Sequence, residues 1–532
     1  MLGENDIVPA DQAPADLSAD NCYYSEATPL LGARPATPSS GNMVEKNIGI
    51  SQQTLVSHGG SEHDGNASTS SVRASKLPQY LAGVAATLGA LAAGLVLGWT
   101  SAGGKDGVKL ANEYELTVTP EDFSWIGSLM TLGAAAVCVP IGVLSDLMGR
   151  KLAMLLLVAP FTVGWLLVIF GSSVLMLDIG RFILGVSGGA FCVTAPTYTA
   201  ETAESAIRGT LGSYFQLMLT AGILASYVLG PLLTIKMLSV VSALVPLVFF
   251  CVFFFMPETP VYHLRKGNVA AARSSLRRLR GPRYDVEPEI QAQQELMAEE
   301  ERNRVSFAEA ISSRAAKRGL LVGFGLMTFQ QLSGVNAIIF YAGSIFEGAT
   351  DSIAPSTATI IVGVIQVVAV FLSTFLVDSL GRRLLLLASE TAMFLTTLVL
   401  GVYFYLKNAG HEVPGWLPLF CICAFIFLFS IGFGPIPWMM MGEIFSPTIK
   451  GVAGSSACLF NWLMAFVVTK YYSPLEKLAG TYTCFWLFSA VCLVGLIFVF
   501  VFVPETKGKS LEDIQFELSG RAPERRHTSD KA

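Results

Sequence analysis

Three amide side chains and a glycine lie close together inside a long apolar stretch that runs from Phe329 to Tyr341. An unpartnered amide is costly in hydrocarbon, so such groups face protein or water. On an unbroken helix Gln331 and Asn336 would point roughly 140° apart. A break at Gly334 would let both amides point into one cavity, and Gln330 and Ser333 lie close to the same glycine. Discontinuous helices of this kind form substrate sites in membrane transporters. The alternative is that the amides only hold neighbouring helices together.

The composition is that of a membrane protein. The chain has 532 residues, of which 52% are hydrophobic and 14% charged, with a mean hydropathy of +0.55. Soluble domains carry about 25% charged residues. No basic face could neutralise phosphates, so a nucleic-acid partner is not expected. None of the 9 cysteines has the spacing of a metal site, and we expect neither metal nor other cofactor.

Apolar runs of about 20 residues, the length that crosses a bilayer, recur along the chain. We predict an all-α membrane protein with twelve transmembrane helices in two pseudo-symmetric six-helix halves. Residues 1–75 would be a disordered cytosolic tail, 76–256 the first half, 257–317 a cytosolic helical linker, 318–503 the second half and 504–532 a cytosolic tail. The expected spans are about 79–99, 123–145, 152–171, 174–198, 210–231, 237–256, 318–347, 356–377, 384–406, 416–441, 452–471 and 481–503.

The distribution of Lys and Arg over the short loops predicts the orientation, because basic loops stay in the cytosol. Arg150, Arg208, Arg382 and Lys450 all fall on one side of the predicted topology, together with the 257–317 linker. Both termini would therefore be cytosolic.

The N-terminal tail contains Glu26, Leu30 and Leu31 in the spacing of an acidic dileucine sorting signal. Such a signal would bind a clathrin adaptor and could hold the protein on endosomal or lysosomal membranes. Without it we expect the plasma membrane.

The sequence contains the same set of motifs twice, in the same order. Asp146, four positions before Arg150, is matched by Asp378, four positions before Arg382, which Arg383 follows. Glu201, seven before Arg208, is matched by Glu443, seven before Lys450. Pro-Glu-Thr at 257–259 is matched by Pro-Glu-Thr at 504–506. The order and the similar offsets indicate duplicated halves with parallel topology.

These repeated charges predict a gate. Acids and bases at helix ends on one face could pair across the two halves. Such pairs would close the cytosolic side while the other side is open, and they must break when the cytosolic side opens. Bases alone would suffice to set topology, so the repeated acids favour gating over a purely topological role. The expected pairs join members of one half to members of the other: Arg150, Glu201, Arg208 and Glu258 to Arg382, Arg383, Glu443, Lys450 and Glu505.

Together with QQLSGVN (330–336), GPIPW (434–438), PETP (257–260) and PETKG (504–508), these signatures resemble the sugar porter family of the major facilitator superfamily. More narrowly, the chain resembles facilitative glucose transporters and is similar to insect facilitated trehalose transporters. The resemblance covers about residues 80 to 515. It implies that the chain carries a neutral sugar across a membrane by alternating access, as a monomer, and that it is not an enzyme.

The resemblance also implies a central sugar site and its gates. Gln and Asn amides both donate and accept hydrogen bonds without burying charge, and an indole offers an apolar face, which suits a neutral polyol. The implied substrate-binding residues are Gln216, Gln330, Gln331, Asn336, Gln366, Trp438 and Asn461. Phe340, Tyr341 and Trp462 match gating positions, and Asp378 joins the charged gate.

The energy source and the substrate stay open at this stage. The first span contains no Asp, Glu, His, Lys or Arg, which favours facilitated diffusion over proton coupling. Glu390 lies within a span, where we expect it to extend toward Arg382 and Arg383. The alternatives are a proton-coupled symporter and a sugar sensor that does not transport. Glucose-like hexoses are slightly favoured over trehalose.

Overall fold

The computed structural model describes residues 74–302, 307–349 and 353–520. Throughout these ranges the regular structure is helical, as predicted. The proposed sorting signal of Glu26, Leu30 and Leu31 lies outside the described residues.

The first half begins with a helix that starts at a proline-containing first turn, a position that suits proline because its missing N–H is not needed there. Helix α3 (Pro120–Met148) begins with a capping box between Thr119 and Asp122, and proline again occupies its first turn. Its helices are α1 (Leu77–Trp99), η1 (Thr100–Gly103), η2 (Lys105–Gly107), α2 (Val108–Tyr114), α3 (Pro120–Met148), α4 (Arg150–Leu156), α5 (Val158–Ile169), α6 (Val174–Thr202), α7 (Arg208–Leu232) and α8 (Ile235–Phe253).

The second half repeats this plan with two interruptions in its spans. Its helices are α13 (Arg314–Leu332), α14 (Val335–Ala349), α15 (Pro355–Leu380), α16 (Arg382–Asn408), α17 (Leu417–Ile431), α18 (Ile436–Ile444), α19 (Pro447–Ala479) and α20 (Thr481–Phe502). Eleven helical stretches in the described residues are long and apolar enough to cross a membrane. The remaining predicted span, 318–347, is divided between α13 and α14.

Short polar helices connect and follow the halves. They are α9 (Pro260–Arg265), α10 (Val269–Arg280), α11 (Glu287–Arg302), α12 (Phe307–Ser312) and α21 (Leu511–Ser519). Arg280 of α10 is almost fully buried and donates to the carbonyl of Thr202 at 2.8 Å and to Glu289 at 2.7 Å. The bond to Thr202 attaches the linker to the first half, and the bond to Glu289 joins α10 to α11. Arg318 of α13 donates to the carbonyl of Leu518 at 3.2 Å, which attaches α21 to the second half.

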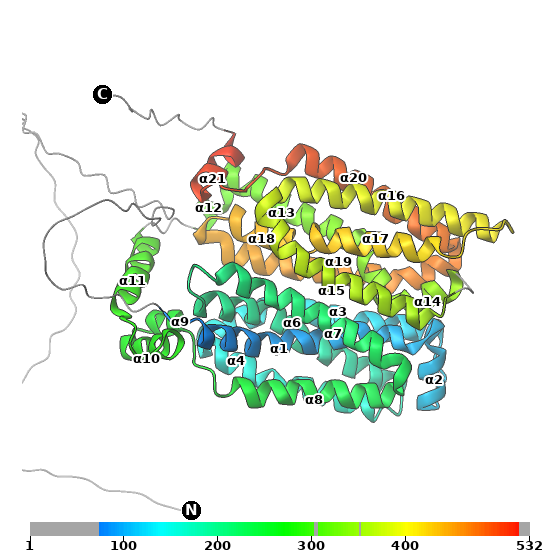
Figure 1. Ribbon diagram of the computed structural model, residues 1–532, viewed down its shortest axis with the longest axis horizontal. Helices are drawn as coiled ribbons and strands as arrows, with labels where there is room; N and C mark the ends of the chain where they lie inside the picture. Colours follow the sequence, from blue (N-terminus) through cyan, green and yellow to red (C-terminus); the bar gives the residue numbers. More distant parts are fainter. Residues whose placement is uncertain (1–73, 303–306, 350–352, 521–532) are drawn as a thin grey trace, which may run out of the picture. The chain divides into compact units, whose positions relative to one another are not determined.

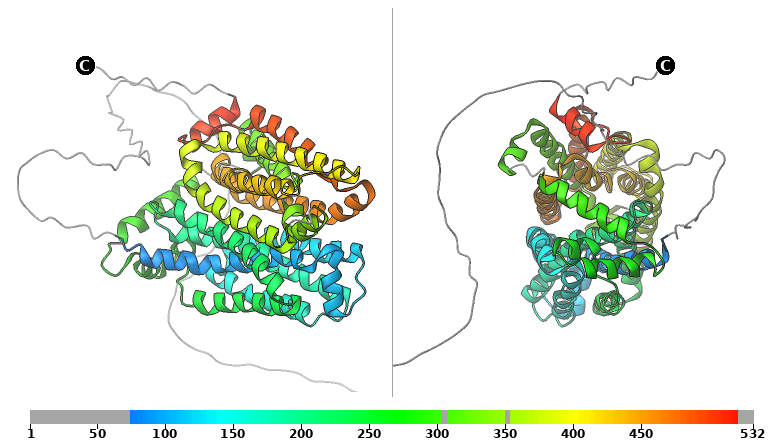
Figure 2. Two further views of the ribbon diagram at one scale, coloured as in Figure 1. Left: turned by 45° about the vertical axis from the view of Figure 1, so that its right-hand side comes forward. Right: turned by 90° about the vertical axis from the view of Figure 1, so that its left-hand side faces the viewer.

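The two halves lie side by side as two layers of roughly parallel helices (Figure 1), and the turned views separate them in the same way (Figure 2). They meet along α3 with α19 and along α7 with α15. The two contacts are equivalent in the duplicated plan. In each of them the second span of one half (α3 or α15) packs on the fifth span of the other half (α19 or α7).

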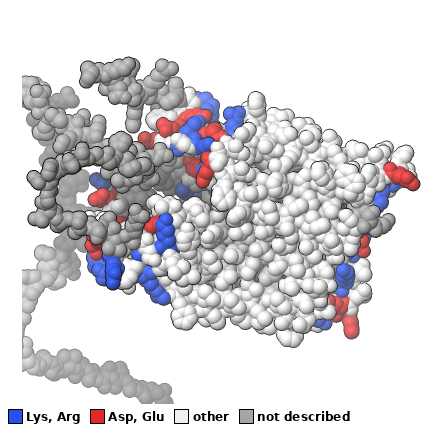
Figure 3. Space-filling view, viewed as in Figure 1, with Lys and Arg blue, Asp and Glu red and all other residues white. Residues whose placement is uncertain are grey.

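Charged side chains gather at the two ends of the helices and leave an uncharged band between them on the face shown in Figure 3. We call the end that carries α9, α10, α11 and α21 the linker end. The other end, which carries α2 and the 105–107 turn, is called the far end. A wide uncharged band of this kind fits the hydrocarbon of a bilayer.

Candidate substrate site and gates

The predicted interruption at Gly334 is present. Helix α13 ends at Leu332 and α14 begins at Val335, and Gly334 between them has φ +90°. A Cβ at this position would lie 2.5 Å from the ring of Phe488. Both the left-handed backbone and the close approach of that ring therefore require glycine.

The break brings three amides of one span together with one from α19. Asn336 donates to Gln331 Oε1 at 2.5 Å, and Gln331 donates to Asn461 Oδ1 at 3.0 Å. Asn461 in turn donates to Gln330 Oε1 at 2.7 Å. Gln330 ends the series by donating to the carbonyls of Phe433 and Gly434 at 2.7 and 3.0 Å. We call Asn336, Gln331, Asn461 and Gln330 the amide relay.

The relay satisfies buried polar groups and also joins α13, α14 and α19. Gln330, Gln331 and Asn461 are buried, whereas Asn336 is partly exposed. The two carbonyls at its end belong to the turn between α17 and α18, where the Gly434–Trp438 motif interrupts the span. Gln330 of α13 therefore connects the two interrupted spans of the second half directly, and Asn461 attaches α19 to the same group of amides.

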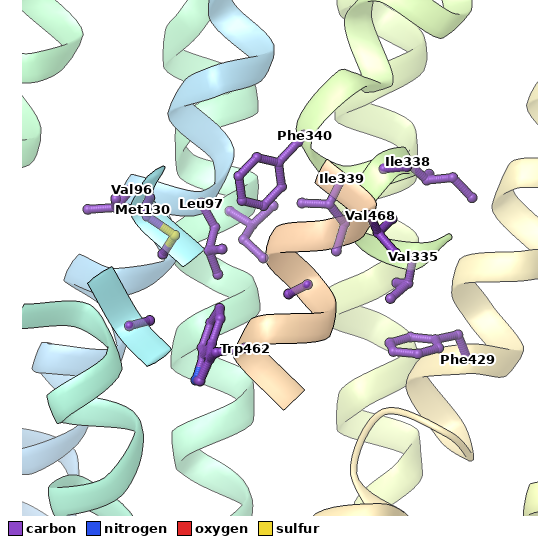
Figure 4. Packing of buried hydrophobic residues seen from close by; sticks show 14 of the residues in the cluster. Val96, Leu97, Met130, Val335, Ile338, Ile339, Phe340, Phe429, Trp462 and Val468 are labelled. Atoms are coloured by element: carbon purple, nitrogen blue, oxygen red, sulfur yellow. The ribbon is translucent and has the colours of Figure 1, made fainter. Parts of the chain in front are cut away.

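Apolar side chains of the two halves pack against each other inside the molecule. Figure 4 shows Trp462 of α19 directed toward Leu97 of α1, and Phe340 of α14 on the other side of Leu97. Phe340 is fully buried, and Trp462 is 9% exposed. This packing joins residues of both halves.

Three residues that the resemblance implied are not bonded to the relay. Gln366 of α15 is buried, Gln216 of α7 is half-buried, and Trp438 of α18 is 39% exposed. No side-chain hydrogen bond between these three and the relay occurs in the described part of the chain. The structure thus brings together four of the seven sequence-predicted binding residues by direct contact.

At the far end, side chains of the two halves are in direct contact. Tyr341 donates to the carbonyl of Thr469 at 2.9 Å, stacks on Tyr472 with ring centroids 5.2 Å apart, and meets Phe123 of the first half edge-on at 6.3 Å. Two further bonds cross the halves: Ser124 Oγ donates to the carbonyl of Lys470 at 2.6 Å, and Tyr227 donates to that of Ile339 at 2.7 Å. The far end is closed.

At the linker end, the repeated charges form ion pairs within the first half. Arg150 contacts Asp146 at 2.7 Å and Glu201 at 3.0 Å. Glu201 also accepts from Thr259 Oγ1 at 2.6 Å. Glu258 accepts hydrogen bonds from the backbone N–H groups of Arg150 and Lys151, the first two residues of α4.

The second half repeats this network. Arg382 contacts Asp378 at 3.3 Å and Glu443 at 3.1 Å, and Glu443 accepts from Thr506 Oγ1 at 2.6 Å. Glu505 accepts the backbone N–H groups of Arg382 and Arg383, both at 3.0 Å.

The predicted pairs across the halves do not occur among the described residues of this conformation, in which the linker end is open. The pairing was expected for the state in which that end is closed, so it stays a prediction. Among the described residues, every ion pair of Arg150 or Arg382 lies within its own half. The reason is that the three helix ends carrying each signature are neighbours inside one bundle. The predicted partners in the other bundle would be reached only if the linker ends approached each other.

The linker end is open along the helices that face each other across the halves. Arg208 and Lys450, at the first turns of α7 and α19, are exposed. A Cβ built on Gly209, Gly212, Gly451 or Gly454 would meet no neighbouring heavy atom within 4 Å. One end of the molecule is therefore closed and the other is open between the halves.

Two basic residues that the sequence analysis did not assign lie deep in the structure. Arg181 of α6 is fully buried and donates to the carbonyls of Ile126 and Val96 and to Thr100 Oγ1, at 2.9 to 3.0 Å. Lys470, at the end of the predicted 452–471 span, lies inside α19 with its Nζ 4.0 Å from the ring centroid of Trp125. A basic residue within a predicted span was the available signal for Arg181.

Glu390 also differs from expectation. We expected its carboxylate to extend toward Arg382 and Arg383, but the residue is fully buried on α16. Neither carboxyl oxygen makes a hydrogen bond of standard geometry in the described structure, and the thiol of Cys492 on α20 is its polar neighbour. A Cβ on Gly495 of α20 would lie 2.5 Å from its Oε1. The close packing of α16 on α20 keeps the side chain inside the bundle.

Comparison with known proteins agrees with this architecture. The chain resembles the xylose transporter XylE of Escherichia coli in a partially occluded inward-open conformation, with a TM-score of 0.68 and 22% identity over 81% of this chain and 99% of that one. This likeness shows that the two chains share a fold. The fold is therefore one of two packed six-helix halves.

Sequence comparison specifies the family. Residues 66–518 match the family model described as "Sugar (and other) transporter". The chain is 40% identical to a facilitated trehalose transporter of Culex quinquefasciatus over 83% of this chain and 86% of that protein, and 39% identical to one of Bombyx mori over 83% and 87%. The matched region is about half the length of several other relatives, such as 56% of the Anopheles gambiae facilitated trehalose transporter at 40% identity. This protein belongs to the sugar transporter family, a family of carriers rather than enzymes.

Proposed function

We propose that this protein transports a neutral sugar across a membrane by alternating access, as a facilitative carrier. The observation that carries the proposal is the amide relay, which places four uncharged donor–acceptor side chains at a helix break between a closed end and an open end. A polyol can replace amide-to-amide bonds with amide-to-hydroxyl bonds at no cost in buried charge. Release then needs only the reverse exchange.

The gates support alternating access. The far-end contacts of Tyr341 and Ser124 must break to admit sugar from that side, while the exposed first turns of α7 and α19 must approach each other to close the linker end. Cross-half pairing of the exposed acids Asp146 and Asp378 with Arg208 and Lys450 would stabilise that second state. Each conformation thus closes one end only.

Trehalose is the substrate that we favour. The relatives named above are facilitated trehalose transporters, and this proposal transfers their printed substrate to a chain 39 to 40% identical to them. A glucose-like hexose is the alternative. Competition between labelled trehalose and labelled glucose in one expression system would distinguish the two.

Facilitated diffusion is supported by the surroundings of Arg181. Its guanidinium is held by two carbonyls and a hydroxyl, and no ion pair with a carboxylate occurs there within the described ranges. Proton coupling here would need a carboxylate that pairs with Arg181 when ionised and leaves it when protonated. No such carboxylate contacts Arg181 in the described structure.

The buried carboxyl of Glu390 favours a second candidate, proton-coupled transport. An ionisable residue inside a membrane bundle is a functional candidate by default, and neither oxygen of Glu390 makes a hydrogen bond of standard geometry in the described structure. The decisive experiment uses purified protein in liposomes with a proton gradient. A uniporter stops at equal sugar concentrations, whereas a symporter accumulates sugar and loses that ability when Glu390→Gln removes the proton.

The same liposomes test the whole proposal. Labelled trehalose should enter, equilibrate and exit at similar rates in both directions. If the purified protein binds sugar but never moves it, the protein is a sensor instead of a carrier.

We further propose that the linker end is cytosolic and that the protein resides in the plasma membrane as a monomer. The short loops at the linker end carry Arg150, Arg382 and Lys450, as the positive-inside rule requires. An endosomal or lysosomal location through adaptor binding to Glu26, Leu30 and Leu31 is the alternative. Replacing Leu30 and Leu31 by Ala should move an internal pool to the cell surface, and an unchanged distribution would argue against the signal.

A further inference from the structure

We propose that the far end carries a second sugar-binding site, separate from the amide relay. A pocket of about 580 Å³ lies there, within the size range of small-molecule sites. It is lined by both halves: Asp106 and Phe123 from the first, and Tyr341, Phe404 and Tyr482 among others from the second. This inference rests on the proposed function, because it assumes that the ligand is the transported sugar.

The local backbone builds one wall of the pocket. Asp106 has φ +53° and lies between Gly104 and Gly107, which have φ +75° and +78°. This tight turn presents the carboxylate to Lys477 of α19, 3.3 Å away. The ion pair connects the two halves across the pocket.

The charged side chains that line the pocket are of both signs: Lys105, Lys407 and Lys477 against Asp106 and Glu476. Lys477 pairs with Asp106, Lys407 donates to the carbonyls of Gly348 and Ala349, and Glu476 accepts from Thr481 Oγ1 at 2.9 Å. The site therefore does not call for a charged ligand.

The remaining lining combines aromatic surface with hydroxyl and amide groups. Phe404 and Tyr482 offer apolar ring surface, and Asn408, Ser344 and Ser473 offer donors and acceptors. Aromatic faces beside uncharged hydrogen-bonding groups match the alternating C–H and O–H surfaces of a neutral sugar. The ligand class is thus a neutral mono- or disaccharide.

The pocket and the amide relay are separated by the closed far-end gate. Tyr341 contributes to the pocket, is bonded to the carbonyl of Thr469 and stacks on Tyr472. Tyr472 stacks in turn on Phe488, the ring that lies against Gly334 at the helix break. Two sugars could therefore occupy the molecule at once, one on each side of this ring stack.

The pocket exists as described only while the far end is closed, because its walls come from both halves. A ligand that binds one state stabilises that state in proportion to its differential affinity. Sugar in the pocket would therefore hold the far end closed. We infer that external sugar at high concentration inhibits its own uptake.

The experiment measures initial uptake of labelled trehalose by intact expressing cells over a wide range of external concentration. The wild type should show a maximum followed by a decline. Tyr482→Ala should weaken the second site roughly tenfold and remove the decline, with uptake at low sugar unchanged. Tyr471→Ala is the matched control, because Tyr471 is an exposed tyrosine at the same end and does not line the pocket.

Calorimetric titration of the purified protein with trehalose gives an independent readout. Two binding events are expected for the wild type, one for Tyr482→Ala, and one for Gln331→Ala, which lacks the central site. If transport occurs with a single binding event and simple saturation, the second site is refuted while the proposed function stands. If no variant transports or binds sugar, the proposed function fails first.

Discussion

Cys138 of α3 and Cys458 of α19 place their sulfur atoms 3.2 Å apart across the interface between the two halves. Both side chains are buried, and both thiols are free. The pair lies on α3 and α19, which form one of the two main contacts between the halves. This relationship allows a direct test of whether the halves move against each other.

Oxidation of this pair should lock the carrier. A disulfide requires the sulfur atoms to approach to about 2.0 Å, a small shift from the present separation. With diamide as the oxidant, the two thiols lose two protons and two electrons to its N=N bond and join to each other. Sugar uptake should fall in proportion to the cross-linked fraction and return on treatment with dithiothreitol. Cys138→Ala should stay active under diamide, and a fully cross-linked protein that still transports would contradict rocking at this interface.

Replacing Gln331 by Ala should reduce sugar uptake at least about tenfold with normal expression. The change removes the central member of the relay and leaves Asn336 and Asn461 without their amide partner, a loss of about 1–3 kcal/mol for a buried hydrogen-bonding group. Uptake normalised to surface protein is the measurement. Gln291→Ala on the exposed face of α11 is the control, and equal uptake by the two variants would remove the relay from the sugar site.

Replacing Gly334 by Ala should impair both folding yield and uptake. The new methyl group would meet the Phe488 ring, and the left-handed backbone disfavours any side chain by roughly 1–2 kcal/mol. Gly410→Ala separates these two causes, since Gly410 has φ +84° but open space around its Cα. Thermal stability in detergent should fall clearly more for Gly334→Ala. Similar losses for both would mean that the ring contact contributes little.

Acid should weaken the second-half network at the linker end. Burial alone would raise the pKa of Glu505, but the backbone N–H groups of Lys507, Arg382, Arg383 and Thr506 outweigh it and hold the pKa below its usual value. A group with a lowered pKa in the folded state stabilises the fold above its unfolded pKa, and this contribution is lost as the pH falls through the folded value. The thermal midpoint should therefore drop below about pH 4.5 more steeply for wild type than for Glu505→Gln, and parallel curves would contradict this assignment.

The sequence by itself determined the helical class, the twelve-span plan and its duplication. These follow from apolar length, from repeated motifs at helix ends and from the cost of unpaired backbone groups in hydrocarbon. It also located the helix break, because Gly334 among amides is a strong local signal. Local chemistry sufficed for these features.

Only the tertiary structure decided which groups meet. The relay between Asn461 and the amides of α13 and α14, the pairing of Arg150 with Glu201 inside one half, and the burial of Glu390 all depend on helix packing across long sequence separations. Side-chain reach is only a few ångströms, so a sequence motif can name a charge or an amide without naming its partner. The closed far end and the open linker end belong to one packing of the two halves, and sequence spacing carries no information about which packing is adopted.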